Sequence, residues 1–238
     1  MTPYYQKGGQ TIYNGDCLGV MSEMTAESVD LIVTDPPYNT GMTAESSSTW
    51  LKNFFDDSYT DEDYLKLVRG GATQMFRLLK PDRALYVYIN WKKLGIWIDE
   101  LERAGFKVKN TIVWDKVIHG LNYMNYAYTH EFIIFATKGS YLPKHKEKGS
   151  QHWKDVWHIQ RAVDTKTDSQ HETVKPLEVL YPPILHGSEE GDSVLDPFGG
   201  TGSTALAAKN LKRNSIIIEM DEKYCEIAKS RLAQDLLF

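Results

Sequence analysis

The sequence predicts an α/β fold built on a mostly parallel sheet. Short apolar runs of strand length alternate with longer segments of helical pattern, which is the order typical of α/β folds. The chain has 238 residues, enough for one large domain with room for a small insertion. We therefore expect a single domain over residues 1–238, in which residues 138–174 form a small inserted segment.

Seven segments have the length and composition of strands. They are rich in β-branched and aromatic residues and lie between turn formers. In chain order they are Gln10–Tyr13, Val29–Thr34, Ala84–Ile89, Lys107–Trp114, Glu131–Ala136, Ser193–Leu195 and Ser215–Ile218.

Five segments between these strands have helical patterns. Asp61 and Glu62 suit the first turn of such a helix, because acidic side chains are stabilised near a helix N-terminus. Gly105 follows another helical segment, as expected of a residue that ends an element. The predicted helices are Asp61–Leu79, Lys93–Ala104, Pro176–Leu185, Ser203–Asn210 and Glu222–Leu232.

Three long stretches fit neither period: Asn39–Ser58, Ile118–Tyr128 and Lys138–Val174. Loops of this length in a compact domain are usually functional or disordered. The third carries several lysines although the whole chain has a net charge of −5. The chain therefore combines a local basic patch in this stretch with an otherwise acidic body.

Composition limits the class of protein. The chain has 42% hydrophobic and 25% charged residues, which is ordinary for globular domains. Its net charge of −5 argues against a wholly basic protein that coats nucleic acid. No apolar run approaches 18 residues, and the first residues lack an apolar signal core, so we expect neither a membrane span nor secretion. The only two cysteines, Cys17 and Cys225, suggest a reducing compartment, and we expect a cytoplasmic protein.

A carboxylate, two prolines and an aromatic ring, Asp35-Pro36-Pro37-Tyr38, follow the predicted strand Val29–Thr34. Ligands of doubly wound sheets bind at the carboxyl ends of strands. Because proline has no backbone N–H, a substrate amine would find two free acceptors, the Asp35 carboxylate and the Pro36 carbonyl. The Tyr38 ring offers a stacking surface. This set suits an aromatic or amide amine, and the alternative is a rigid turn with a capping aspartate.

A glycine-rich run, Asp196–Thr204 (DPFGGTGST), follows the predicted strand Ser193–Leu195. A turn of this kind between strand and helix allows a ligand to approach the backbone closely. Glu219 ends the next strand, and an acid at about this spacing can bind ribose hydroxyls. No Gly-Lys-Ser/Thr sequence supports a phosphate loop of the NTPase type. The alternative is a glycine-rich turn with a solvent-facing glutamate.

Two shorter motifs also lie next to predicted elements. Asn14-Gly15-Asp16 follows the first strand, where Asp16 could accept from an adenine amino group. The run His171–Pro176 (HETVKP) precedes a helix and could place backbone N–H groups and a cation near a carboxylate. A plain turn and a helix start with proline in its first turn are the respective alternatives.

In this order, the motifs resemble those of amino-group DNA methyltransferases that use S-adenosylmethionine. The tetrad precedes the glycine-rich loop, which resembles the circularly permuted beta group of that family. Further similarity lies in Leu79–Pro81, Asn110–Lys116 and His130–Ile134, so that about residues 10–234 are covered. One departure is Glu172, which replaces a proline of the family motif. The resemblance implies a Rossmann-like class I methyltransferase fold, with a seven-stranded, mostly parallel sheet and a reversed last strand.

The resemblance also assigns roles to single residues. Asp35, Pro36, Pro37 and Tyr38 would be the catalytic tetrad. S-adenosyl-L-methionine would be the cofactor. Its ribose would lie at Glu219, its adenine at Asp16, and its methionine part at the glycine-rich turn. No metal is expected. The implied cofactor-binding residues are Asp16, Cys17, Thr34, Asp35, Thr173, Lys175, Asp196, Phe198, Gly200, Thr201, Glu219 and Met220.

The implied partner is DNA, from whose duplex the target base would be flipped. The residues expected to contact DNA are Asn39, Lys144, Lys146 and Lys148. Adenine N6 is the expected target, because an aspartate at the first tetrad position goes more often with adenine in this family and a serine with cytosine. Cytosine N4, RNA adenine and a DNA-binding protein without catalysis are the alternatives.

The segment that would recognise the target is shorter than is usual in the beta group. It could read a short site, act within a homodimer, or share the task with the Asn39–Ser58 loop. Trp153 and Trp157 in this segment could stack on bases or form its own core, and we expect the core role. The family resemblance is compatible with a restriction-modification role and with a solitary methyltransferase.

Overall fold

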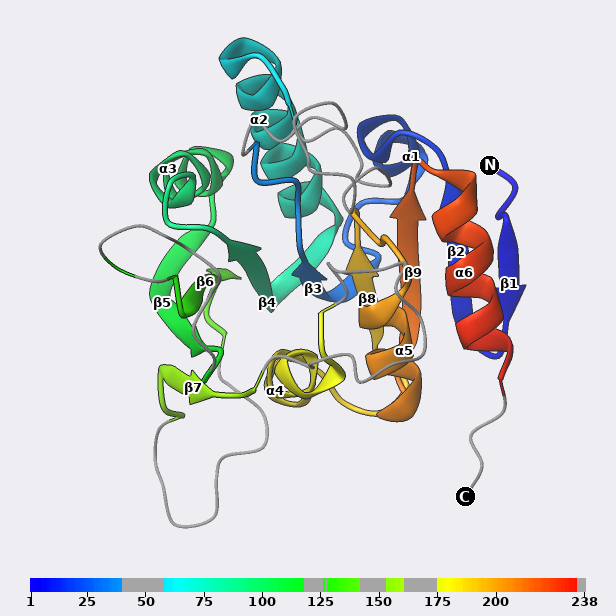
Figure 1. Cartoon of the computed structure of the whole chain (residues 1–238). Coiled ribbons are helices and arrows are strands. Elements are labelled where there is room, and N and C mark those ends of the chain that lie inside the picture. Colours follow the sequence, from blue (N-terminus) through cyan, green and yellow to red (C-terminus); the bar gives the residue numbers. More distant parts are fainter. Residues whose placement is uncertain (40–57, 118–125, 127, 142–152, 161–174, 235–238) are drawn as a thin grey trace, which may run out of the picture.

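The computed structural model describes residues 1–39, 58–117, 126, 128–141, 153–160 and 175–234. Within these ranges the strands form one sheet of order β1-β2-β9-β8-β3-β4-β6-β5-β7 (Figure 1). The elements are β1 (Tyr5–Lys7), β2 (Gln10–Asn14), α1 (Cys17–Glu23), β3 (Val29–Thr34), α2 (Asp61–Leu78), β4 (Leu79–Ile89), α3 (Leu94–Ala104), β5 (Lys107–Asp115), β6 (His130–Lys138), β7 (Val156–His158), α4 (Leu177–Gly187), β8 (Ser193–Asp196), α5 (Ser203–Asn210), β9 (Asn214–Glu219) and α6 (Glu222–Ala233).

Five neighbouring strands, β2, β9, β8, β3 and β4, run parallel, as predicted. All seven predicted strands are confirmed, but the expectation of seven strands with the last one reversed needs correction. The described sheet has nine strands, and β6 runs antiparallel to both of its neighbours, β4 and β5, rather than lying last. The short edge strands β1 and β7 were missed because each has only three residues, too few to show a period.

Helices cover both faces of the sheet, and side chains of β3 show how the layers are divided. Ile32 packs with α1, α2 and α3 on one face. Leu31 and Val33 pack with α4 and α5 on the other, since successive side chains of a strand point to opposite faces. Every residue of β3 is therefore buried, as is typical of a strand inside a parallel sheet. Figure 1 shows α2 and α3 on the opposite side of the sheet from α4 and α5.

The predicted helices begin and end within a few residues of the observed ones. Thr60 caps α2, because its hydroxyl accepts a hydrogen bond from the Asp63 backbone N–H at 3.1 Å. Gly105 ends α3 in the left-handed conformation, with φ of 109°. The helix α1, which the sequence did not predict, is capped by Asp16, whose carboxylate accepts from the Gly19 N–H at 2.7 Å.

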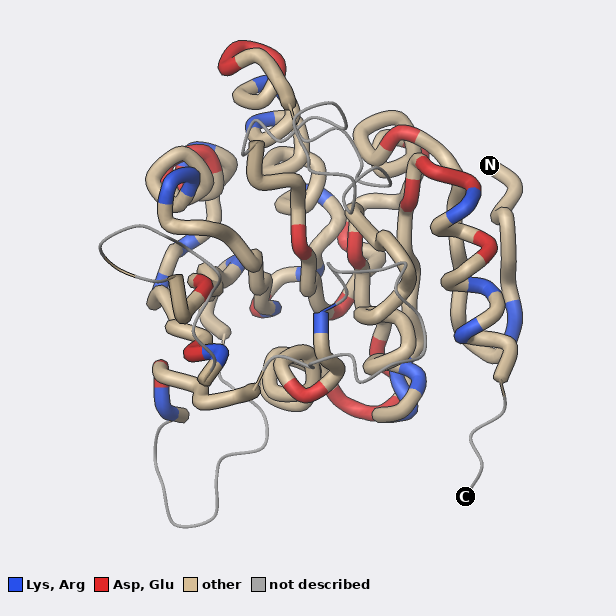
Figure 2. Tube along the Cα trace, in the orientation of Figure 1, with Lys and Arg blue, Asp and Glu red and all other residues tan. Residues whose placement is uncertain are grey.

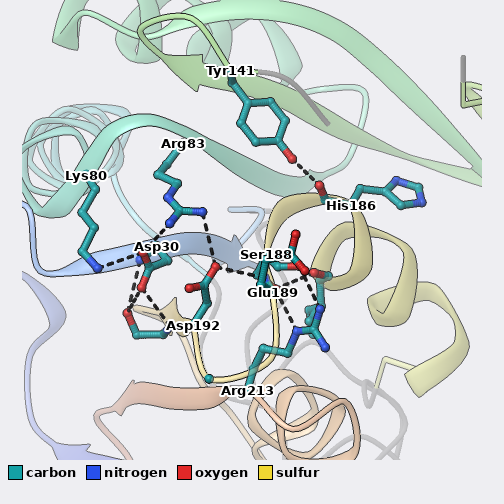
Figure 3. A network of polar contacts seen from close by, with 12 residues as sticks. Asp30, Lys80, Arg83, Tyr141, His186, Ser188, Glu189, Asp192 and Arg213 are labelled. Carbon is teal, nitrogen blue, oxygen red and sulfur yellow. Dashed lines mark hydrogen bonds and ion pairs between the residues drawn. The ribbon is translucent and has the colours of Figure 1, made fainter. Parts of the chain in front are cut away.

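A polar cluster joins β3, β4 and β8 at their amino ends, away from the tetrad (Figure 3). Asp30 pairs with Lys80 at 2.8 Å and with Arg83 at 2.9 Å. It also accepts a hydrogen bond from the Ser193 hydroxyl at 2.9 Å. These contacts explain why β4 begins at Leu79, before the predicted start: the polar residues Lys80 and Arg83 hold this part of the chain against β3.

No helix in the described ranges is long and apolar enough to span a membrane.

Candidate active site

The tetrad ends the buried strand β3, as the sequence predicts. Neither proline has an N–H to continue the ladder of hydrogen bonds, so the strand stops there. The Pro37 carbonyl accepts from the Tyr64 hydroxyl at 3.1 Å. That hydroxyl in turn accepts from the Trp97 indole N–H at 3.1 Å, so α2 and α3 together fix the turn. The tetrad thus lies on a rigid support rather than on a free loop.

Charged side chains from three parts of the chain meet at the tetrad. The Lys175 ammonium lies 2.8 Å from an Asp35 carboxylate oxygen and donates to a Glu131 oxygen at 3.1 Å. The Tyr38 hydroxyl donates to Asp35 at 2.7 Å, and Lys116 pairs with the other Glu131 oxygen. This part of the site therefore holds two carboxylates and two ammonium groups, whose formal charges balance.

Burial and charge shift the pKa values of this cluster in different directions. Burial raises the pKa of Asp35 above its usual range, and Lys175 opposes the rise. Burial would also raise the pKa of Glu131, but Lys175 and Lys116 lower it to about 2. Burial would lower the pKa of Lys175, but Asp35 and Glu131 outweigh it and raise this pKa. Glu131 and Lys175 are therefore charged at neutral pH.

Three aromatic rings surround the Lys175 ammonium. Its nitrogen lies 5.6 Å from the ring centroid of Tyr38, 5.1 Å from that of Tyr88 and 5.8 Å from that of Trp114. Rings at this distance attract a cation and also offer flat apolar surfaces. The surroundings of Asp35 therefore suit a planar ring that carries an amino group.

The glycine-rich turn connects β8 to α5 and is closely packed. A Cβ atom on Gly199 would lie 2.7 Å from the Ile217 Cβ, and one on Gly202 would lie 2.8 Å from the Ala228 Cβ. Gly200 differs, since its φ is +49° and nothing lies within 4 Å of its Cβ position. The turn therefore needs glycine for packing at two positions and presents open backbone at the third.

Asp196 begins this turn and is buried. Its Oδ1 accepts from the Thr34 hydroxyl at 2.8 Å and from the Phe198 N–H at 3.0 Å. Burial raises the pKa of Asp196 to about 6, although hydrogen bonds from Thr204, Thr34 and Phe198 oppose the rise. A carboxyl held in this way is poised to change its charge near neutral pH.

Glu219, at the end of β9, contacts the same turn. One carboxylate oxygen accepts from the Gly200 N–H at 2.7 Å and the other from the Asp221 N–H at 2.8 Å. Burial raises the pKa of Glu219.

Two further predicted residues lie near this end of the cavity. Burial and the nearby Asp16 carboxylate raise the pKa of the Cys17 thiol to about 12, so this cysteine stays protonated. Met220, which follows β9, is 56% exposed.

A single cavity of about 430 Å³ joins the tetrad to the glycine-rich turn, a volume within the range of about 300–1,000 Å³ common for small-molecule pockets. Among the residues predicted for the site, those that line it are Asp16, Cys17, Thr34, Asp35, Pro36, Pro37, Tyr38, Lys175, Asp196, Phe198, Gly200, Thr201, Glu219 and Met220.

Other lining residues have no predicted role, and four of these belong to the charged and aromatic cluster around Lys175: Tyr88, Trp114, Lys116 and Glu131. Glu131 is reachable because β6 is reversed, which brings its first residues to the carboxyl ends of the parallel strands. The sequence signal that could have indicated a role for Glu131 is a charged residue at the start of an otherwise apolar strand.

Other predicted residues lie elsewhere. Asn39, in the left-handed conformation with φ of 48°, accepts on its side-chain oxygen from the Tyr59 N–H at 2.9 Å. Thr173, Lys144, Lys146 and Lys148 lie outside the described residues.

The two tryptophans of the inserted segment pack inward. The Trp153 ring stacks on that of His186 in α4, with centroids 3.4 Å apart. Trp157 meets His186 edge-to-face and packs against the buried cluster between the sheet and α4 and α5. Both rings therefore have a packing role, as expected, but they pack against the main domain and not in a core of the segment's own. Within the described part of the chain, no cluster of three or more His, Cys, Asp or Glu side chains could hold a metal ion.

Comparisons with known proteins identify similar chains. The model of the family N6_N4_Mtase, described as DNA methylase, matches residues 29–230. Type II methyltransferase M2.MboI of Moraxella bovis is 31% identical over 247 residues, which cover 96% of this chain and 90% of that protein. The crystal structure of the M1.HpyAVI–SAM complex has a TM-score of 0.71 at 27% identity, and covers 94% of this chain and 100% of that one. The cytosine-N4-specific PvuII DNA methyltransferase, with a TM-score of 0.77 at 16% identity, shares the fold over 99% of this chain and 90% of its own.

Proposed function

Because the chain belongs to the N6_N4_Mtase family of DNA methylases, we propose that it transfers a methyl group from S-adenosylmethionine to the N6 amino group of adenine in DNA. The observation that carries this proposal is the shared cavity, in which the Asp35 tetrad and the glycine-rich turn line the same space. A nucleophile held at Asp35 would therefore face a cofactor held at the turn.

The residues of the turn fit S-adenosylmethionine. Gly200 leaves its backbone open toward the cavity, and the Glu219 carboxylate beside it has acceptor capacity left for ribose hydroxyls. Asp16 and Cys17 lie at the same end, where we place the adenine, while Asp196 and its neighbours would hold the methionine part. When bound, this cofactor supplies an electrophilic methyl group on a sulfonium.

The tetrad binds and orients the target amine. Asp35 and the Pro36 carbonyl would accept its two hydrogens, and Tyr38 would stack on the base, a contact worth about 1–3 kcal/mol. Acceptors that are already in place stabilise the positive charge that grows on the attacking nitrogen. The protein thus contributes position and electrostatics, and needs no covalent bond of its own to the substrate.

Adenine is favoured over cytosine by the aspartate at the first tetrad position. Asp35 offers a carboxylate that is fixed by two donors, Tyr38 and Lys175. Both adenine and cytosine carry an aromatic amine, so the choice rests on the family pattern at this position.

We assign contact with DNA to the residues that the family resemblance implies. In Figure 2 the acidic first turn of α2 stands out in red, while Lys and Arg are spread over many elements. We place the basic contacts at Lys144, Lys146 and Lys148, and assign residues 138–174 to target recognition within one methyltransferase domain. Asn39 would contact the backbone of DNA next to the tetrad. The protein would act in the cytoplasm of a bacterial or phage-infected cell, alone or as a homodimer.

The direct test is transfer of labelled methyl groups from S-adenosylmethionine to mixed-sequence DNA, followed by mass analysis of the nucleosides. N6-methyladenine is the expected product. N4-methylcytosine would overturn the choice of base, and the absence of any methylated nucleoside in DNA would overturn the proposal.

A further inference from the structure

Both oxygens of the Asp35 carboxylate are engaged. The Tyr38 hydroxyl donates to Oδ1 at 2.7 Å, and the Lys175 ammonium lies 2.8 Å from Oδ2. The carboxylate has further acceptor sites, so a target amino group that approaches Asp35 binds beside these two donors or takes the place of one of them. A buried donor displaced in this way needs another acceptor, because a buried polar group without a partner is destabilising.

The same two donors reach a second carboxylate. Glu131 Oε2 accepts from the Lys175 ammonium at 3.1 Å and lies 3.2 Å from the Tyr38 hydroxyl oxygen, whose one proton is donated to Asp35. Asp35 and Glu131 approach from different directions, since one follows β3 and the other lies near the start of the reversed strand β6. Each donor is therefore already within hydrogen-bond distance of both carboxylates.

The other side of Glu131 is held in place. Its Oε1 pairs with the Lys116 ammonium, which lies 5.4 Å from the Trp114 ring centroid. The Glu131 side chain is only 16% exposed, and the two ammonium groups keep it ionised. Glu131 can thus act as a fixed acceptor while the contacts of Asp35 change.

We propose that Glu131 is a positioning residue that retains the Lys175 ammonium and the Tyr38 hydroxyl when the target amino group binds Asp35. The inference rests on the proposed function and deepens it. Retention at Glu131 frees acceptor positions on Asp35 without leaving a buried donor unpaired. It also keeps the ammonium from pairing with Asp35 while positive charge grows on the attacking nitrogen, which the ammonium would otherwise oppose.

Retention of the Lys175 ammonium at Glu131 explains why a lysine can lie at a site that binds a neutral amine. Without Glu131, Lys175 would have Asp35 as its remaining carboxylate partner among the described contacts, and the two would form a lasting ion pair. The target amine would then compete with the charged Lys175 ammonium for an oxygen of Asp35. We therefore expect the loss of Glu131 to affect the chemical step more than the binding of DNA.

The test compares Glu131→Gln, Lys175→Met and the double variant in single-turnover methyl transfer. The change E131Q should lower the rate constant at saturating DNA by about tenfold or more, with a much smaller change in KM. Adding Lys175→Met to this variant removes the ammonium that would stay on Asp35. The double variant should therefore be faster than E131Q, whereas two independent losses would make it slower.

Glu100→Gln is a matched control. Glu100 is a buried carboxylate on α3 with two cationic partners, Arg69 at 3.0 Å and Arg103 at 3.3 Å, and does not line the cavity. Its variant should lose stability but keep the rate constant. Thermal unfolding of all variants separates folding from chemistry. The double variant also removes both members of a buried ion pair, so if E131Q alone does not fold, the double variant is compared with Lys175→Met and should transfer methyl groups at a similar rate.

The outcomes separate the inference from the proposed function. A wild-type protein that does not methylate DNA contradicts the proposed function. An active wild type together with an equally active E131Q, or a double variant slower than E131Q, contradicts the role of Glu131 alone. A slow E131Q that is partly rescued by Lys175→Met supports it.

Discussion

The Glu219 carboxylate accepts a hydrogen bond from the Gly200 backbone N–H at 2.7 Å, which ties the end of β9 to the glycine-rich turn. The two residues lie 19 positions apart in sequence and both line the cavity. The turn is therefore held to β9 by the same side chain that we propose for the cofactor ribose, so that one carboxylate would have a structural and a binding role.

Replacing Glu219 with alanine should weaken the binding of S-adenosylmethionine. The change removes the acceptor for the Gly200 and Asp221 N–H groups as well as the one proposed for ribose, and should raise Kd by about tenfold or more. Titration calorimetry measures this directly. Glu222→Ala, at an exposed position one turn away, is the control and should leave Kd unchanged. An unaltered Kd for Glu219→Ala would exclude it from the cofactor site.

Gly200 and Gly191 form a matched pair for testing the turn. Both have positive φ, +49° and +85°, and neither has an atom within 4 Å of its Cβ position, but only Gly200 lines the cavity. Alanine at either position should cost about 1 kcal/mol of stability through backbone strain. Only Gly200→Ala should also weaken S-adenosylmethionine binding, because its methyl group would enter the cofactor space. Equal affinities in the two variants would move the cofactor away from this turn.

The stability of the ligand-free protein should depend on pH through Asp196. Its pKa rises from 3.8 to about 6 on folding, so the folded state holds this proton more tightly than the unfolded state. Its favourable contribution is complete below pH 4 and is lost as the pH rises through 6. Relative to the wild type, Asp196→Asn should gain up to about 3 kcal/mol in unfolding free energy between pH 4 and 7. Denaturant titrations at both pH values provide the comparison, and a constant difference would contradict a buried, protonated Asp196.

Asp30 should matter for stability and not for catalysis. Its carboxylate holds Lys80, Arg83 and Ser193 together at the amino ends of the strands (Figure 3). Asp30→Asn should cost about 2 kcal/mol in unfolding free energy and leave the rate of methyl transfer unchanged. Slower methyl transfer by Asp30→Asn with an unchanged unfolding free energy would contradict this expectation.

The same cluster has a pH dependence of the opposite sign. Burial would raise the pKa of Asp30, but the hydrogen bonds from Lys80 and Ser193 lower it below 3.8. Its contribution to stability is therefore present above pH 4 and is lost as the pH falls toward the folded-state pKa. The stability difference between wild type and Asp30→Asn should shrink in acid.

Much of the fold follows from local pattern. Val29–Thr34 and Ser203–Asn210 were predicted with the bounds that the structure has, because an apolar run and a glycine turn mark their ends clearly. By contrast, the short helix α1 was missed, since seven residues after Asp16 show little periodicity. The place of β6 between β4 and β5 is set by packing between distant segments, which a local pattern does not contain.

The candidate site likewise contains residues that local sequence predicts and residues that it does not. Asp35 and Glu219 were predicted because each ends a strand whose neighbours run parallel, so that their position depends on local sequence and one general rule. Glu131 and Lys116 were not given roles, because their place in the cavity depends on the reversed strand. Sequence predicts single residues at strand ends, whereas the charged cluster around Lys175 requires the tertiary structure.

The most direct test of the account is single-turnover methyl transfer by the wild type and Asp35→Ala, with S-adenosylmethionine binding measured on the same samples. We predict that the wild type forms N6-methyladenine in DNA. Asp35→Ala should bind the cofactor with similar affinity and transfer no detectable methyl group, because the amine loses its main acceptor. Methylation of DNA by Asp35→Ala at the wild-type rate would contradict the central claim that Asp35 positions the target amino group.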